Sequence, residues 1–174
     1  VDFFTDVGVS CEDAIALGVA WKLDAQRVAE ISRQEFVDGW FALGCEDSEA
    51  ITSYIKKLEA ELARDARTFR KFYQWCFRFH KEAEEHKTID PETAVELWPL
   101  LLKGKKFELL PRWLDFLGTK LGQEMKAVSL DVWLQILDFC NEIKPNLSNW
   151  DNHQLTQDGA WNSVIDDFVD FLQS

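Results

Sequence analysis

The fold of this chain is decided by the stretch Asp158-Gly159-Ala160-Trp161-Asn162-Ser163-Val164-Ile165-Asp166-Asp167-Phe168-Val169-Asp170-Phe171-Leu172, near its carboxyl end. The apolar residues recur at helical spacing, which predicts an amphipathic helix with one buried face. That face comprises Trp161, Val164, Ile165, Phe168, Phe171 and Leu172. The acids are then expected to face outward. From Asp151 to the end there are five Asp and no Lys or Arg, so a basic partner would complement this surface.

The same spacing of three and four residues extends outward through most of the 174 residues. Gly and Pro are few, and runs that alternate apolar and polar residues do not occur, so the pattern predicts a single all-α domain. A polar connection at 82–87 divides it into halves, 1–85 and 86–174, and a polar stretch at 144–157 predicts a surface loop. Helices are expected over about 2–7, 12–23, 32–44, 48–64, 68–81, 91–102, 109–121 and 129–143, before the final one.

Composition excludes several classes of protein. The chain is 47% hydrophobic with eight Trp and thirteen Phe, which is typical of a folded globule with a sizeable core. Its net charge of −12 disfavours binding to nucleic acid or to an anionic membrane surface. The four Cys are far apart and form no C-x-x-C pair, which indicates reduced, buried thiols in an intracellular protein.

The segment from Asp24 to Glu35 has the length of a calcium-binding EF-hand loop and its acidic first and last positions. Helices are predicted on both sides of it. The ligand chemistry is missing, however, because Gln26 and Val28 stand where oxygen-rich side chains are wanted and Ala29 replaces the turn-forming Gly. We therefore predict an EF-hand-like helix pair without calcium.

An enzyme is poorly supported by the sequence. There are three His, no two of them at helical i,i+4 spacing, and no phosphate-cradling loop or nucleophile motif. Cys76 and His80 share a helical face, which a buried thiol beside a half-exposed His explains. We predict no catalytic residue, no metal and no cofactor. A calcium-responsive or other helical interaction module, and a small-molecule enzyme that uses acids in a cleft, stay open as alternatives.

Several motifs resemble the PONY (potentiating neddylation) domain of the defective-in-cullin-neddylation family. The most specific is Asp158-Gly159-Ala160-Trp161 followed by Val164-Ile165-Asp166-Asp167-Phe168-Val169. The resemblance continues through 32–39 with 43–45, through 69–74, and through Leu97-Trp98 with Trp113, so that nearly the whole chain is covered. In one departure, Asn162 stands where a Pro commonly follows Gly-Ala-Trp.

The resemblance implies a non-catalytic co-ligase in cullin neddylation, located in the nucleus, the cytoplasm or both. Matched by position, Asp131, Ala160 and Asp166 would form an acidic patch that binds the cullin's C-terminal winged-helix subdomain. The residues alone also allow a structural interpretation of both acids. Asp131 lies in the first turn of a helix, and Asp166 could close a capping box with Ser163.

The resemblance implies a second site as well. It is a hydrophobic pocket for the acetylated N-terminal Met of the neddylation-conjugating enzyme, whose adjoining segment binds as an amphipathic helix. Leu97 replaces a commoner aromatic residue there. Helical periodicity alone does not distinguish such a wall from core packing. Carried over by position, the lining would be Ala16, Val19, Ala20, Leu23, Ile31, Phe79, Leu97 and Leu100.

Overall fold

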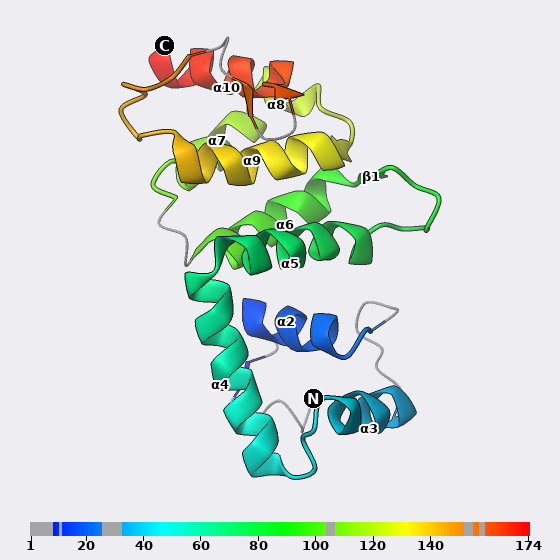
Figure 1. Ribbon diagram of the computed structural model, residues 1–174. Helices are drawn as coiled ribbons and strands as arrows, with labels where there is room; N and C mark the ends of the chain where they lie inside the picture. Colours follow the sequence, from blue (N-terminus) through cyan, green and yellow to red (C-terminus); the bar gives the residue numbers. More distant parts are fainter. Residues whose placement is uncertain (1–8, 11, 26–32, 104–106, 152–154, 157–158) are drawn as a thin grey trace. The chain divides into compact units, whose positions relative to one another are not determined.

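The computed structural model describes residues 9–10, 12–25, 33–103, 107–151, 155–156 and 159–174. The chain divides into two compact units, Val1–His80 and Lys81–Ser174. The described residues are mostly helical, as the sequence predicts (Figure 1). Among them, no helix is both long enough and apolar enough to cross a membrane.

The first unit is built from four described helices. They are α2 (Ala14–Lys22), α3 (Arg33–Ala42), α4 (Ser48–Arg64) and α5 (Ala66–Phe79). The apolar face of α4 is buried as predicted, and α2 packs against both α4 and α5 (Figure 1). Rings join these helices, since the Trp21 and Phe72 centroids lie 5.6 Å apart and those of Trp40 and Tyr54 lie 5.8 Å apart. One core cluster of this unit comprises Val19, Leu23, Trp40, Cys45, Ile51 and Ile55.

Capping Asp residues decide where α4 and α5 begin. The Asp47 carboxylate accepts from the Ala50 N–H at 2.8 Å, so α4 begins at the predicted residue. The predicted start of the next helix at Thr68 is two residues late. Asp65 caps α5 by accepting from the N–H groups of Arg67 and Thr68. A bond from the Thr68 hydroxyl, together with these two, lowers the pKa of the Asp65 carboxyl group.

The predicted EF-hand-like loop cannot be followed through its length, because residues 26–32 lie outside the described part of the chain. That segment contains Gln26, Val28 and Ala29, on which the prediction rests. The flanking helices are present as α2 and α3. Gly44, just beyond α3, has a φ of +72°, which is the left-handed conformation expected after a helix C-terminus.

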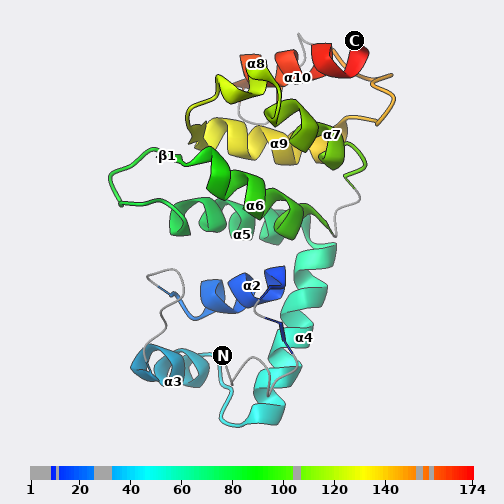
Figure 2. The same cartoon turned by 180° about the vertical axis from the view of Figure 1, so that it is seen from behind.

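The second unit contains α6 (Pro91–Leu102), α7 (Leu110–Leu117), α8 (Lys120–Gln123), α9 (Leu130–Glu142) and α10 (Ser163–Gln173). Helix α10 contacts α7 and α9 within this unit (Figure 2). Its buried residues are Ile165, Phe168 and Val169. The core is rich in aromatic rings, with Phe168 of α10 lying 5.1 Å from Trp113 and 5.6 Å from Phe139 between ring centroids.

Two features of this unit depart from the sequence prediction. The helix predicted over 109–121 is interrupted at Gly118-Thr119, where the Thr119 hydroxyl donates to the Phe116 carbonyl and accepts from the Gly122 N–H. A Cβ on Gly122 would lie 2.3 Å from the Phe116 carbonyl oxygen, so this tight turn requires Gly.

The second departure is the presence of short strands. β1 (Thr88–Ile89) pairs antiparallel with β2 (Val128–Ser129), with Thr88 opposite Ser129. β3 (Leu155–Thr156) pairs antiparallel with β4 (Gly159–Ala160). Each strand has two residues, which is too short for the alternating pattern that would reveal a strand in the sequence.

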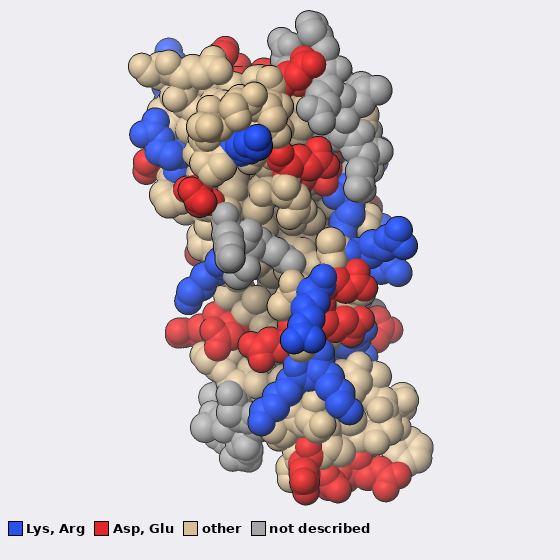
Figure 3. Space-filling model, turned by 60° about the vertical axis from the view of Figure 1, so that its left-hand side comes forward, with Lys and Arg blue, Asp and Glu red and all other residues tan. Residues whose placement is uncertain are grey.

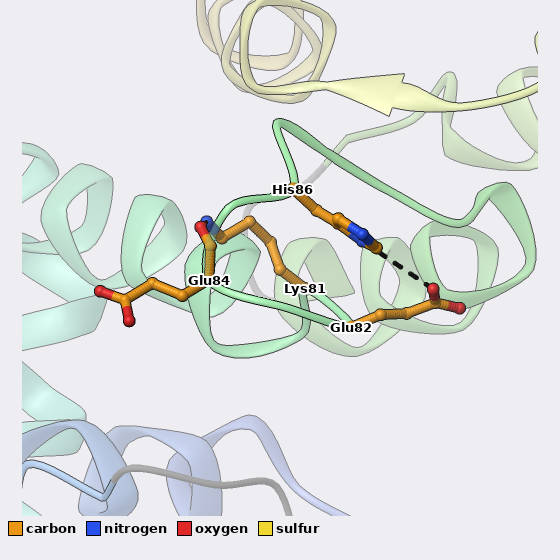
Figure 4. Close-up of polar contacts among 4 residues, drawn as sticks. All are labelled: Lys81, Glu82, Glu84 and His86. Atoms are coloured by element: carbon orange, nitrogen blue, oxygen red, sulfur yellow. Dashed lines mark hydrogen bonds and ion pairs between the residues drawn. The ribbon is translucent and has the colours of Figure 1, made fainter.

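Polar side chains make contacts within the connection between α5 and β1 (Figure 4). The Lys81 ammonium donates to the Glu84 carbonyl oxygen. His86 Nδ1 lies 3.9 Å from Glu82 Oε2, and both side chains are largely exposed, so this pair contributes little to stability.

Candidate functional site: the junction of α9 and α10

Two of the three predicted patch residues are exposed at the junction between α9 and α10. Asp131 lies in the first turn of α9, and Ala160 ends β4, just before α10 begins. The third, Asp166, lies in the first turn of α10 and is half-buried. All three belong to the second unit.

Hydrogen bonds join the two helices at this junction. The Gln135 amide nitrogen donates to Asp131 Oδ1 at 3.2 Å and to the Ala160 carbonyl at 2.9 Å. Gln135 Oε1 accepts from the Asn162 N–H at 2.7 Å. The Asn162 amide donates in turn to Asp131 Oδ2 at 3.0 Å. Asp131 and Ala160 are thus brought together by Gln135, which the sequence interpretation did not single out, and by Asn162, which it noted only as a departure from the common Pro.

The N-terminus of α10 differs from the prediction in its cap. Asn162 is the cap residue rather than Ser163, because its Oδ1 accepts from the Val164 N–H at 3.2 Å. The Asn162 carbonyl then accepts from the N–H of Asp166 at 3.4 Å. The residue that replaces the family's common Pro therefore connects the helix carrying Asp166 to Asp131.

Asp166 is more buried than the amphipathic pattern predicts. Among the described residues, its Oδ1 atom is buried without a hydrogen-bond partner. Desolvation by burial raises the pKa of this carboxyl group, and the charges of Asp167 and Asp170 raise it further. The expectation that the acids face outward is thus wrong for Asp166, one of whose oxygens is directed into the protein.

No cation from the same helices compensates these charges. Neither α9 nor α10 contains a Lys or Arg residue. The Arg112 guanidinium of α7 lies 4.9 Å from the centre of the Phe171 ring on α10. The face drawn in Figure 3 carries both acidic and basic side chains. The α9–α10 junction therefore carries acids on two helices that both lack basic residues, and α6 is a further described helix with acids and no Lys or Arg.

The predicted pocket residues are distributed over both units. Val19, Ala20 and Leu23 are buried around α2, and Leu97 is buried on α6. Ala16, Phe79 and Leu100 are half-buried, and the Phe79 ring stacks on Trp75 at 4.3 Å between centroids. Ile31 lies outside the described residues. The burial is compatible with core packing and with a pocket wall alike.

Cys76 and His80 form a local contact. His80 Nδ1 donates to the Cys76 carbonyl at 2.8 Å. Burial lowers the pKa of His80 and raises that of the Cys76 thiol, so both groups are held neutral. Among the described residues, no three His, Cys, Asp or Glu side chains are grouped in a way that could hold a metal ion.

Comparison with known proteins identifies the family. The family model for cullin binding matches residues 50–171, which include the whole α9–α10 junction. The chain is 34% identical over 171 residues to DCN1-like protein 4 of Danio rerio, covering 98% of this chain and 57% of that protein. It is 32% identical over 175 residues to defective in cullin neddylation protein 1 of Yarrowia lipolytica, covering 99% of this chain and 69% of that protein. This chain therefore belongs to the cullin-binding family of DCN1-like proteins.

Proposed function

We propose that this chain acts in cullin neddylation as a non-catalytic co-ligase, and that the α9–α10 junction binds a basic surface on the C-terminal winged-helix subdomain of a cullin. The observation that carries the proposal is the hydrogen-bonded cluster that joins Asp131 and Ala160 to the start of the helix bearing Asp166. The names of the relatives support the pathway, and the family match spans all three residues.

The chemistry of the three residues suits a basic partner. Asp131 is exposed, and each of its oxygens accepts a bond from a neutral amide, so neither bond brings a cation to it. Asp166 is half-buried, and the desolvation that raises the pKa of its carboxyl group would be offset by a cation donor from a partner. Each charge-assisted bond would contribute about 1.5–3 kcal/mol. The small side chain of Ala160 would let the partner approach closely.

Such a protein would accelerate cullin neddylation by bringing the two reacting proteins close together. Holding a cullin and a charged conjugating enzyme together raises the effective concentration of donor and acceptor and restricts their orientation. No residue of the chain needs to take part in bond making. The chain spans 57% of the Danio rerio relative's length, and the proposal concerns the part that corresponds to it.

The proposal is tested by calorimetric titration of this chain with a folded C-terminal fragment of a cullin. We expect saturable binding that weakens as salt is added, because salt screens charges exposed at the rim of an interface. A series of cullins should be tried, since cullins are expected to differ in affinity. Absence of binding to every folded fragment at low salt would contradict the proposal.

We further propose that the second partner is the acetylated N-terminus of the neddylation-conjugating enzyme. The support is the resemblance stated above, together with two apolar residues of the first unit that are half-buried at matching positions, Ala16 and Phe79. Acetylation would matter because it removes the charge of the α-amino group, which is costly to bury in an apolar slot.

The peptide prediction can be checked with three versions of one sequence. An N-terminal peptide of the conjugating enzyme with acetyl-Met is expected to bind roughly 100-fold more tightly than the same peptide with a free amine. A peptide beginning with acetyl-Ser tests whether the apolar Met side chain is needed, and we expect it to bind weakly. Equal calorimetric affinities for the acetylated and free Met peptides would rule out the pocket.

A further inference from the structure

Gln135 is a buried polar residue in the middle of an apolar helix. Its side chain is 1% exposed, and it stands between Leu134 and Ile136, which are also buried. An amide in such a position is costly unless it is hydrogen-bonded. It makes three bonds, donating to Asp131 and to the Ala160 carbonyl and accepting from the Asn162 N–H. The cost of burying it is thereby offset by contacts to the patch itself.

One orientation of the amide satisfies all three bonds. With its oxygen and nitrogen exchanged, the NH₂ group would meet the Asn162 N–H, and the oxygen would meet the Asp131 carboxylate and the Ala160 carbonyl. The position thus requires a donor and an acceptor on one short, uncharged side chain. Gln meets this requirement, whereas Glu lacks the donor and Met lacks both.

The second member of the cluster is Asn162. Its side chain uses Oδ1 to cap α10 and Nδ2 to hold Asp131 Oδ2. Asp131 therefore receives one neutral donor on each oxygen, Gln135 on Oδ1 and Asn162 on Oδ2. These bonds restrain the carboxylate without an opposing charge, so its attraction for an external cation is preserved.

We propose that Gln135, assisted by Asn162, is a positioning residue that holds Asp131 and the Ala160 backbone in the arrangement a basic partner recognises. This inference rests on the proposed cullin-binding function. Preorganisation of this kind improves affinity because the side chain is already ordered before binding. Gln135 itself is buried and would act through the two residues that it bonds.

The test is a double-mutant cycle with Gln135→Met and Asp131→Ala, measured by calorimetry against the cullin fragment. Gln135→Met keeps the length of the side chain and removes its bonds. We expect roughly tenfold weaker binding than wild type. In the Asp131→Ala background, the same change should weaken binding by only about twofold, because one of the residues that it orients is gone. Additive losses, or no loss in Gln135→Met, would overturn the positioning role.

A second variant covers the case in which Gln135→Met does not fold. Asn162→Ser keeps a side chain that caps helices well but removes the donor to Asp131. It is expected to bind several-fold more weakly with an unfolding midpoint near that of wild type, and unchanged affinity would contradict the inference. Failure of the wild-type chain to bind would instead contradict the proposed function. If the wild-type chain binds the cullin fragment, Asp131→Ala binds it more weakly and Gln135→Met binds it as wild type does, the proposed function stands. The positioning role of Gln135 is then contradicted.

Discussion

Asp166→Lys is expected to abolish binding to the cullin fragment while leaving the helical circular dichroism unchanged. The substitution removes a charge-assisted bond worth about 1.5–3 kcal/mol and places a cation opposite the partner's basic surface. A loss of 1000-fold or more in affinity is therefore expected, on the order of 4 kcal/mol. Calorimetric titration measures the loss, and retained binding would show that Asp166 does not contact the partner.

Two control variants distinguish a direct contact between Asp166 and the partner from a general effect of changing the protein's charge. Asp170→Lys makes the same charge change one turn later on α10, at an exposed position, and should cost much less affinity if Asp166 makes a specific contact. Asp166→Asn removes the charge without reversing it and should give an intermediate loss. Equal losses of affinity in Asp166→Lys and Asp170→Lys would indicate long-range electrostatic repulsion instead of a direct contact at Asp166.

Asp166→Asn also reports how much the negative charge of Asp166 lowers the stability of the free protein. Burial raises the carboxyl pKa above the ordinary 3.8, with a further rise from Asp167 and Asp170, so the ionised form destabilises the folded state at neutral pH. This destabilisation is relieved as the pH falls through the raised pKa of the folded state, and it is gone below the unfolded value. The Asn variant should therefore have the higher unfolding midpoint at neutral pH, with the difference vanishing in acid.

Ala160→Arg is expected to give the second large loss, of roughly 100-fold or more in affinity. Ala160 is exposed, so the longer side chain should be accommodated without unfolding. The added cation would compete for the Asp131 carboxylate and repel a basic partner, and its bulk would hold the two surfaces apart. The loss is measured by the same calorimetric titration, beside circular dichroism of the free variant.

The controls for Ala160→Arg separate its charge from its size. Ala160→Ser stays small and neutral and should bind as wild type does. Ala160→Gln adds bulk without charge, and its loss reports the steric part. Ala63→Arg adds the same charge on an exposed position of α4, which belongs to the other unit. A loss in Ala63→Arg as large as that in Ala160→Arg would contradict a local patch.

Much of the fold was predictable because the signals are local. Helices α4 and α6 span the predicted residues, since a capping Asp starts each and an apolar stripe continues through it. Asp131 and Asp166 were also placed in first helical turns, as the sequence indicates. The interruption at Gly118-Thr119 was missed because the Thr119 hydroxyl bond that stabilises it has no signature in helical periodicity.

The sequence by itself therefore determined the helical class, most helix boundaries and the identity of the acids near the carboxyl end. Tertiary structure alone decided how those acids are held. The bonds from Gln135 to Ala160 and Asn162 span 25 and 27 residues, and the bond from Asn162 to Asp131 spans 31. Periodicity reports on neighbours within a few turns of one helix. Contacts across such separations form only when α9 and α10 pack together.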